Sequence, residues 1–371
     1  MTRRRIFFLF LIVLALAGVL AVAACGGGGF DPQSKVDSVR LFTIKADKPY
    51  ALPGESVTLE ALFTDARKEK PRPLKNYWIP IVCLNPRDDL YYLCFIPSAG
   101  GDAGGPRFIP GGIDASVPDG GVPEAGTGTG GTDAGAGAGG FLSSIPTGVD
   151  LGPFLPQGNT FTFTMPQDAV QPRVGTDPYG LAIVFNMLCA GKVILVDRDP
   201  SGGPQQVPLK CVDEENQPLP PADYVIGISR VYSYTTKTNT NPVIERVTFD
   251  GKDIDIAKGI EVEKCTGVSK REECPEHKID VKVPDSSWEE NPSEKVSGGG
   301  AIHEQIWVAY YGDHGDFKDD ARLLFDTKRG RVSESDDVWR APYDPVDGTI
   351  WAVVHDNRGG AAWVVIPVHV R

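Results

Sequence analysis

Short segments in which apolar and polar residues alternate recur along this 371-residue chain. Residues 36–44, 55–63, 159–166 and 224–234 show the pattern, and turn-forming residues such as Gly, Pro, Asn and Asp bound them. A period of about two residues places alternate side chains on one face of a β-strand, whereas an amphipathic helix needs a period of about 3.6. No segment has a convincing helical period. The sequence therefore predicts an all-β protein with little helix.

The alternating pattern restarts at Asn241 and continues at residues 277–284, 304–312, 349–357 and 361–370. The last two segments form the clearest hairpin, with Asp356–Gly360 as its loop. The final strand has an all-aliphatic face, formed by Ala362, Val364, Ile366, Val368 and Val370. Such a face is typical of the inside of a β-sandwich. We expect two β-sandwich modules, one over residues 35–238 and one over residues 241–371.

Two quoted segments point to a known kind of sandwich. "PGESVTLEA" at residues 53–61 and "VVHDNRGG" at residues 353–360 resemble parts of bacterial immunoglobulin-like and PKD-like domains. The resemblance implies tandem immunoglobulin-like modules. The first module departs from it, because it is about twice the usual length of such a domain, which is near 100 residues.

A long low-complexity segment interrupts the first module. Ser98–Gly140 has 16 glycines in 43 residues, with one aromatic residue and six charges. Such a composition buries too little apolar surface to offset chain entropy, so we expect a disordered insertion. It serves either as an exposed spacer or as a tolerated insertion without a role.

The amino-terminal segment predicts export. Arg3–Arg5 precede an uncharged apolar run, Ile6–Ala24, and Cys25 and four glycines follow it. The run of 19 residues could just span a bilayer. Its small terminal residues instead favour cleavage of residues 1–24 as a signal peptide. Val22-Ala23-Ala24-Cys25 resembles the lipobox of bacterial lipoproteins, which implies diacylglycerol on the Cys25 thiol and acylation, for example by palmitate, of the new amino terminus. An uncleaved helix and an unmodified secreted chain remain the alternatives.

The residues after Cys25 bear on location and partners. Residues 25–34 would form a glycine-rich tether between lipid and folded body. Gly26 stands where Asp favours inner-membrane retention in known lipoproteins, so the resemblance implies the outer membrane. The chain after residue 24 has 34 basic and 49 acidic residues, a charge of −15. This balance argues against nucleic acid as a partner, because phosphate binding needs clustered cations.

Six cysteines remain after Cys25, and an even number in an exported chain predicts disulfides. Sequential pairing is favoured, because each pair is close in sequence: Cys83–Cys94, Cys189–Cys211 and Cys265–Cys274. One objection concerns the first pair. If residues 78–84 and 90–97 formed a hairpin, Cys83 and Cys94 would face opposite sides. Cys83 would then need a distant partner such as Cys189, or the loop would be wider.

No motif in the chain names an enzyme. His303–Trp307, "HEQIW", has no second histidine at the spacing of a zinc protease, and it lies in a predicted strand. A nucleophile elbow, a phosphate-binding loop and a Cys-x-x-Cys pair are absent from the sequence. We expect a non-enzymatic protein without a cofactor. The alternative is an envelope hydrolase whose site is assembled from loops between the modules.

Two groups of residues are candidates for ligand binding. Calcium prefers oxygen ligands, and an acidic stretch offers Asp313, Asp316, Asp319 and Asp320. The alternative is a solvated acidic loop. Trp351 and Trp363 lie on the terminal hairpin and could stack on a sugar, or they could belong to the core. Both faces of this hairpin are apolar, so the second module should pack against the first module or against a partner protein.

These observations predict a lipid-anchored outer-membrane lipoprotein with a structural or binding role. Its partners would be the membrane, through Cys25, and a protein or glycan of the cell envelope.

Overall fold

The structure is a computed structural model that describes residues 32–95, 107–110, 146–197, 207–295 and 301–371. In these ranges the regular elements are β-strands and six 3-10 helices of three to five residues. The helices are η1 (Arg87–Asp89), η2 (Tyr91–Phe95), η3 (Gly152–Phe154), η4 (Pro221–Asp223), η5 (Arg271–Glu273) and η6 (Asp285–Ser287). The all-β prediction is confirmed. The described part of Ser34–Arg371 forms one compact unit.

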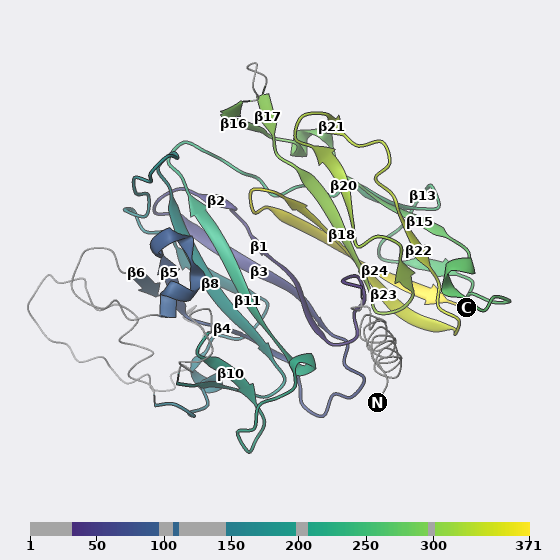
Figure 1. Cartoon of the computed structure of the whole chain (residues 1–371), viewed down its shortest axis with the longest axis horizontal. Coiled ribbons are helices and arrows are strands. Elements are labelled where there is room, and N and C mark those ends of the chain that lie inside the picture. The colour runs from purple at the N-terminus through teal and green to yellow at the C-terminus, as the bar shows by residue number, and fades with distance from the viewer. Residues whose placement is uncertain (1–31, 96–106, 111–145, 198–206, 296–300) are drawn as a thin grey trace, which may run out of the picture. The chain divides into compact units, whose positions relative to one another are not determined.

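We keep the predicted names first module and second module for residues 35–238 and 241–371. The strands of residues 35–238 form three sheets (Figure 1). The first sheet has the order β1–β3–β7, formed by Val39–Ala46, Ser56–Asp65 and Thr160–Thr164. The second has the order β2–β11–β8–β5–β6, formed by Tyr50–Ala51, Tyr224–Ser233, Gly180–Cys189, Ile81–Leu84 and Arg107–Pro110, and β4 (Lys75–Trp78) also pairs with β8. The third is a hairpin of β9 (Lys192–Leu195) and β10 (Leu209–Val212).

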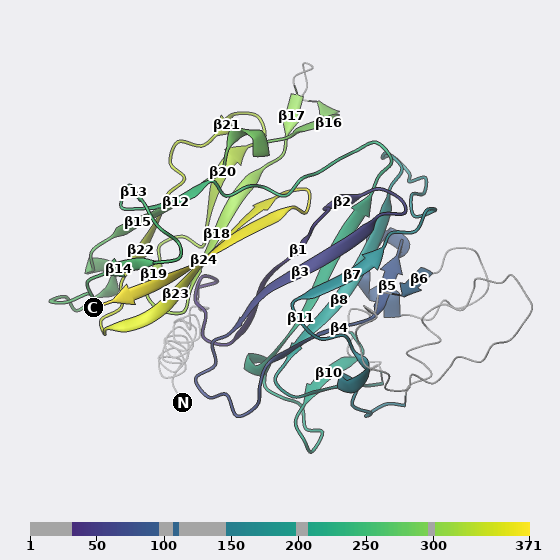
Figure 2. The ribbon, with the colours of Figure 1, turned by 180° about the vertical axis from the view of Figure 1, so that it is seen from behind.

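Strand β8 explains why the first module exceeds a two-sheet sandwich. All ten of its residues are buried. One face, with Ala182 and Val184, packs in a core shared with β3 and β7. Figure 2 shows β1 and β3 in front of β8 and β11. The opposite face, with Ile183 and Phe185, packs in a second core against η2, the segment around η3 and the β9–β10 hairpin. A strand covered on both faces reads as a continuous apolar run, as residues 181–189 nearly do.

The second module has two large sheets. One has the order β13–β12–β15–β22–β19, formed by Lys252–Asp253, Arg246–Phe249, His277–Lys282, Asp337–Arg340 and Asp316–Phe317. The other has the order β14–β24–β23–β18–β20–β21, formed by Ile260–Val262, Ala361–Val370, Val346–Asp356, Ile306–Gly312, Ala321–Asp326 and Gly330–Arg331. A further hairpin joins β16 (Glu290–Lys295) and β17 (Ala301–His303).

One core lies between these two large sheets. Its members include Ile279 and Trp339 from the first sheet and Tyr310 and Ile366 from the second. Ile366, Val368 and Val370 are buried in this core, as the aliphatic face of the last strand predicts. The predicted terminal hairpin is also present, with β23 and β24 antiparallel from His355–Ala361 to Val346–Val370.

The structure differs from the sequence analysis at two local points. The hairpin considered above as a condition, residues 78–84 with 90–97, does not form: β5 pairs with β6 and β8, and Tyr91–Phe95 is the 3-10 helix η2. Within the predicted insertion Ser98–Gly140, Arg107–Pro110 form β6 and pair with β5. The rest of that segment lies outside the described residues, so its predicted disorder stays a prediction.

Candidate functional site

The predicted lipidation residue, Cys25, and the apolar run before it lie outside the described residues. Among the residues that the structure does describe, no helix has the length and apolarity needed to cross a membrane. Cleavage before Cys25 and its lipidation therefore stay predictions.

The six remaining cysteines form three disulfides, which join Cys83 to Cys94, Cys189 to Cys211 and Cys265 to Cys274. This is the sequential pairing that the sequence favours. The objection to the first pair disappears because residues 91–95 are helical, so strand alternation does not decide where Cys94 points. The Cys83–Cys94 bond closes a short loop in which Asn85, Asp88 and Asp89 have positive φ.

The four aspartates predicted to bind calcium do not form a common site. Each carboxylate has its own protein partner: the amides of Thr349 and Ser34 for Asp313 and Asp320, and the guanidinium groups of Arg271 and Arg322 for Asp316 and Asp319. Across the described ranges, no group of three or more His, Cys, Asp or Glu residues is placed to hold a metal ion. The prediction of calcium ligands at these positions is not supported by the geometry.

Trp351 does not face solvent, because a β-bulge in β1 directs Phe42 onto it. The β1–β3 register shifts between Leu41 and Thr43, so Phe42 is the extra residue. Bulges re-aim side chains in this way. Leu41 and Ile44 both pack toward the first-module core, although they are three residues apart. The Phe42 side chain projects from the opposite face of β1 and stacks on Trp351, with ring centroids 4.9 Å apart.

Phe42 and Trp351 belong to an apolar seam between the modules, made of Val36, Phe42, Trp351 and Val353. Trp351 is only 5% exposed. Of the two roles considered for Trp351, the structure supports the buried one and not stacking on a ligand, because another protein side chain covers the ring. Trp363 is half-buried at the margin of the seam, with the ammonium of Lys45 4.1 Å from its ring centroid. Both tryptophans thus contact the first module, which accounts for the second apolar face of the hairpin.

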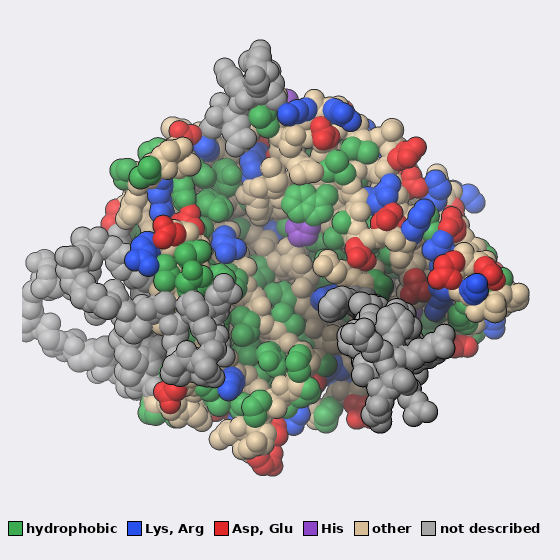
Figure 3. Space-filling view, viewed as in Figure 1, with side chains coloured by type: hydrophobic (Ala, Val, Ile, Leu, Met, Phe, Trp, Pro, Cys, Tyr) green, Lys and Arg blue, Asp and Glu red, His purple; other side chains and the backbone are tan. Residues whose placement is uncertain are grey.

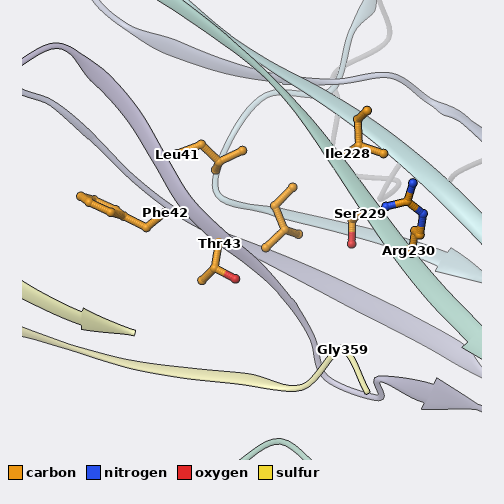
Figure 4. A pocket seen from close by; sticks show the side chains of 8 residues that line it. Leu41, Phe42, Thr43, Ile228, Ser229, Arg230 and Gly359 are labelled. Carbon is orange, nitrogen blue, oxygen red and sulfur yellow. The ribbon is translucent and has the colours of Figure 1, made fainter. Parts of the chain in front are cut away.

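An open pocket of about 350 Å³ lies next to the seam. It is lined by Leu41–Ile44 of β1, Ile228–Arg230 of β11 and Gly359 of the β23–β24 loop. Figure 4 shows Leu41 and Phe42 leaving β1 on opposite sides, with Arg230 across from Leu41. The lining combines apolar side chains with the hydroxyl groups of Thr43 and Ser229 and one guanidinium, that of Arg230, and it holds no carboxylate or imidazole. The pocket therefore marks where the hairpin loop meets the first module.

The same loop is built around the buried carboxylate of Asp356. Its Oδ1 accepts hydrogen bonds from the amides of Arg358 (2.7 Å) and Gly360 (2.8 Å). A Cβ on Gly360 would lie 2.0 Å from Asp356 Oδ2, so only glycine fits there. The Nδ2 of Asn239, from the chain between the modules, donates to Asp356 Oδ2 at 3.3 Å. Asp356 thus fixes both the loop and the inter-module segment.

Arg358 extends from this loop to two glutamates. Its Nε donates to Glu304 Oε2 at 2.8 Å, and its terminal nitrogen lies 2.5 Å from Glu289 Oε2. Glu304 is 1% exposed. Burial, which outweighs the nearby guanidinium, raises the pKa of Glu304 to about 7. Burial also raises the pKa of Asp356. We call Glu289, Glu304, Asp356 and Arg358 the junction cluster.

A second group, the tyrosine cluster, is formed by Tyr50, Tyr179, Tyr232 and Tyr234. The ring centroids of Tyr50 and Tyr234 are 4.7 Å apart, and those of Tyr179 and Tyr232 are 5.7 Å apart. All four side chains are half-buried. Tyrosines of this kind present an apolar ring and a polar hydroxyl together, which is the composition enriched at protein interfaces.

Charged side chains hold the tyrosine cluster in place. Tyr179 donates its hydroxyl to Asp89, and burial together with that hydrogen bond raises the pKa of Tyr179 to about 12. The guanidinium of Arg173 lies 4.5 Å from the Tyr179 ring centroid and pairs with Asp89 at 3.5 Å. Asp89 has φ 57°, in the left-handed region that costs energy for a non-glycine residue. The disulfide-closed loop thus holds a strained acid beside the cluster.

Sequence reasoning missed this cluster. The only local signal was the pair Tyr232 and Tyr234, which alternation places on one face of β11. Tyr50 and Tyr179 come from segments far away in sequence. Tyr50 joins the group because β2 pairs in parallel with the end of β11, a pairing that nothing in "KPYALPGE" predicts.

The described histidines lie apart from one another and contact different groups. His277 and His369 each place Nδ1 2.9 Å from a carboxylate, of Asp250 and Asp347 respectively. His355 stacks on Trp307, with ring centroids 5.4 Å apart. Burial lowers the pKa of His355 to about 4.

On the face drawn in Figure 3, acidic and basic side chains are interspersed, with hydrophobic side chains between them.

No family model matches this chain, and no curated protein matches it in sequence. Among solved structures, it is similar to the crystal structure of dimeric latent PorU from Porphyromonas gingivalis, at 10% identity and a TM-score of 0.20. The alignment covers 90% of this chain and 24% of the PorU chain, so the chain spans about a quarter of that protein. A similarity this low carries no argument about function.

Proposed function

We propose that the protein is a non-enzymatic lipoprotein of the outer membrane, a folded binding module anchored through lipid on Cys25. The support for anchoring is the amino-terminal sequence: a basic start, an apolar run, small residues, and a cysteine followed by glycines. Several acyl chains on one residue hold a protein stably at a bilayer. Three disulfides accord with an exported chain. The finer family assignment, tandem immunoglobulin-like or PKD-like modules, is part of this proposal.

The tyrosine cluster is the observation that carries the binding role. Four half-buried rings, held by a disulfide-closed loop and by ion pairs, form a rigid surface that loses little entropy on binding. Tyrosine is also among the residues that dominate binding energies at protein interfaces. Exposed charges of both signs adjoin it: Arg87 and Asp88 are 77% and 73% exposed. Such a rim is typical around an interface core.

We favour a protein of the envelope over a glycan as the partner. Most ring pairs in the cluster are tilted, with interplanar angles of 47° for Tyr50–Tyr234 and 61° for Tyr179–Tyr232. Stacking on consecutive sugars needs rings in a common plane. Trp351, which could have supplied such a plane, is covered by Phe42. A protein partner can adapt to tilted rings through its own side chains.

Site-specific photo-crosslinking in intact cells tests the binding role. A photoreactive residue placed at Tyr234 should give a discrete protein adduct, and one at Tyr343 of the second module, an exposed tyrosine outside the cluster, should not. Tyr179→Ala should abolish the adduct, because it removes the ring that Asp89 and Arg173 position. Equal adducts from both positions, or an adduct that survives Tyr179→Ala, would contradict this site. If the protein instead binds an envelope glycan, and Tyr179→Ala abolishes that binding, the partner at this site is a glycan and not a protein.

Anchoring is tested separately. The intact mass of the native protein should begin at Cys25 with acyl mass added, and the Cys25→Ser variant should leave the membrane fraction. A native mass that includes residues 1–24 would show that this segment is not cleaved. Gly26 would then no longer support location in the outer membrane.

A further inference from the structure

Strand β7 ends its sheet with an edge that no other described strand covers. In the order β1–β3–β7 it pairs with β3 alone. Asn159, just before β7, and Met165, just after it, both bond to β3 through their backbone. Because the backbone groups of successive residues point to opposite sides of a strand, the two phenylalanines of β7 also bond to β3. The N–H and C=O groups of its three threonines therefore point away from β3, toward the open edge: Thr160, Thr162 and Thr164.

This edge lacks the usual protection against pairing with another strand. Edge strands in native proteins are blunted by charged residues, proline, bulges or very short length. Among the described strands of four or more residues that end a sheet, β7 alone has no charged residue. At the other end of the same sheet, β1 has Arg40, Lys45 and the bulge at Phe42. The uncharged stretch around β7 extends from Leu151 to Gln167. No charge at this edge would repel a second strand of the same kind.

The sequence of β7 matches itself when two copies pair antiparallel. Thr-Phe-Thr-Phe-Thr reads the same in both directions about Thr162. A two-fold axis at Thr162 places this residue opposite its own counterpart, and Thr160 opposite Thr164 of the second copy. The same axis places Phe161 opposite Phe163 on the other face, where both rings are buried in the first-module core. Exposed threonines thus meet threonines and buried rings meet buried rings, so the register matches on both faces.

We infer that β7 is a dimerisation strand, through which a second copy of this chain pairs antiparallel about a two-fold axis at Thr162. The pairing joins the β1–β3–β7 sheets of the two copies into one continuous sheet. Each threonine pair exchanges two N–H···O bonds between the strands, and opposed threonine side chains add cross-strand contacts. Because both copies use the same surface, the association closes at two chains. The inference depends neither on the tyrosine cluster nor on lipid at Cys25.

Cysteine cross-linking tests the register. In the full chain with Cys25→Ser, the remaining cysteines are all in disulfides, so an introduced cysteine is the one free thiol. In the dimer the Cα atoms of Thr162 in the two copies would lie about 5.5 Å apart, within the range of about 4.4–6.8 Å that a disulfide bridges. Those of Thr160 would lie about 13 Å apart, because they are offset by four residues along the strand. Under a mild oxidant, Thr162→Cys should form covalent dimers at least about tenfold faster than Thr160→Cys or Thr164→Cys alone.

A mixture of two single variants supplies the matched control. Thr160→Cys mixed with Thr164→Cys should form a covalent dimer of the two different chains, because these positions face each other only across the two copies. If Thr160→Cys alone cross-links as fast as Thr162→Cys, the thiols meet by collision and the inference is overturned. Absence of the covalent dimer from Thr162→Cys also overturns it.

A charge on the edge tests the association without an introduced thiol. Thr162 is exposed, so Thr162→Lys leaves the core intact, but in the dimer it places two lysines opposite each other. Sedimentation velocity should show the unsubstituted full chain as a dimer and Thr162→Lys as a monomer. Ser56→Lys adds the same charge at an exposed residue of β3, on the same face but one strand away from the edge, and should remain dimeric. An unsubstituted chain that is monomeric, or a dimer that persists with Thr162→Lys, would overturn the inference. So would an adduct of Thr162→Cys with a different envelope protein in place of the dimer.

Discussion

Replacing Phe42 by alanine should weaken the coupling between the two modules more than it weakens either module. Phe42 is the residue that the β1 bulge directs into the seam, where it contacts the rings of Trp351 and Tyr311 with both centroid distances at 4.9 Å. The substitution leaves the first-module core intact, because Leu41 and Ile44 remain in place. The loss therefore falls on the contact between modules.

The magnitude follows from the buried area. A phenylalanine side chain buries about 200 Å², and this one is 9% exposed. At about 25 cal/mol per Å² the transfer free energy is about 4–5 kcal/mol. The retained methyl group and the compactness of real denatured chains reduce this to about 3 kcal/mol. Two aromatic contacts add about 0.5–1.5 kcal/mol each. These terms sum to about 4–6 kcal/mol, which overlaps the upper part of the range of about 3–5 kcal/mol for Phe→Ala in cores.

Equilibrium unfolding in guanidinium chloride, with disulfides intact, measures this effect. The native protein should unfold with coincident transitions in far-UV circular dichroism and tryptophan fluorescence. Phe42→Ala should separate them into two transitions. The control is Phe163→Ala, a buried phenylalanine of the first-module core, which should destabilise that module without removing any seam contact. A loss below about 1 kcal/mol, or the same pattern from both variants, would refute the seam as the coupling element.

Three further predictions concern charge and covalent links. Arg358→Met should lower the free energy of unfolding by about 3–5 kcal/mol, because it leaves buried carboxylates without their cation. Calorimetry would measure this loss. A loss below about 1 kcal/mol would mean that water hydrates these carboxylates in the folded protein. Asp337 is 1% exposed, and burial raises its pKa to about 6. Because the folded chain then binds the proton more tightly, this group's contribution is complete below about pH 4 and is lost as the pH rises through 6. Asp337→Asn should remove that decline in urea titrations, and an unchanged slope would contradict it. Breaking the Cys189–Cys211 disulfide with alanines should cost roughly 3 kcal/mol for a loop of 22 residues, and an unchanged melting temperature would argue that the hairpin closes without it.

Much of the fold was predictable because its information is local. Alternation located β1, β3, β7, β11 and β24, since the side-chain period of a strand is set by its own residues. The "DNRGG" loop predicted its hairpin through residues that accept unusual backbone angles, and Gly359 has φ 97°. Sequential disulfides followed from proximity along the chain. The short strands β9, β10, β14 and β19 were missed, because four residues or fewer carry no reliable period.

The functional candidates were less predictable. Trp351 was correctly placed on an apolar face, but whether Phe42 or a ligand covers it depended on one bulge in β1. The four acidic residues at 313–320 suggested a cation site, yet each found a partner from another segment. A run of acidic residues in the sequence indicates which carboxylates need a partner. It does not indicate which cation, amide or metal ion will be that partner.

The sequence by itself determined the strand pattern, the terminal hairpin, the cysteine pairs and the amino-terminal features on which anchoring is proposed. All of these depend on residues within about 25 positions of one another. Only the tertiary structure decided the tyrosine cluster, the seam and the junction cluster. Tyr50 meets Tyr234, Phe42 meets Trp351, and Asn239 meets Asp356 across stretches of chain that no local period spans. The physical reason is that burial sets the chemistry of these groups, and burial is a property of the packed sheets and not of the residues one by one.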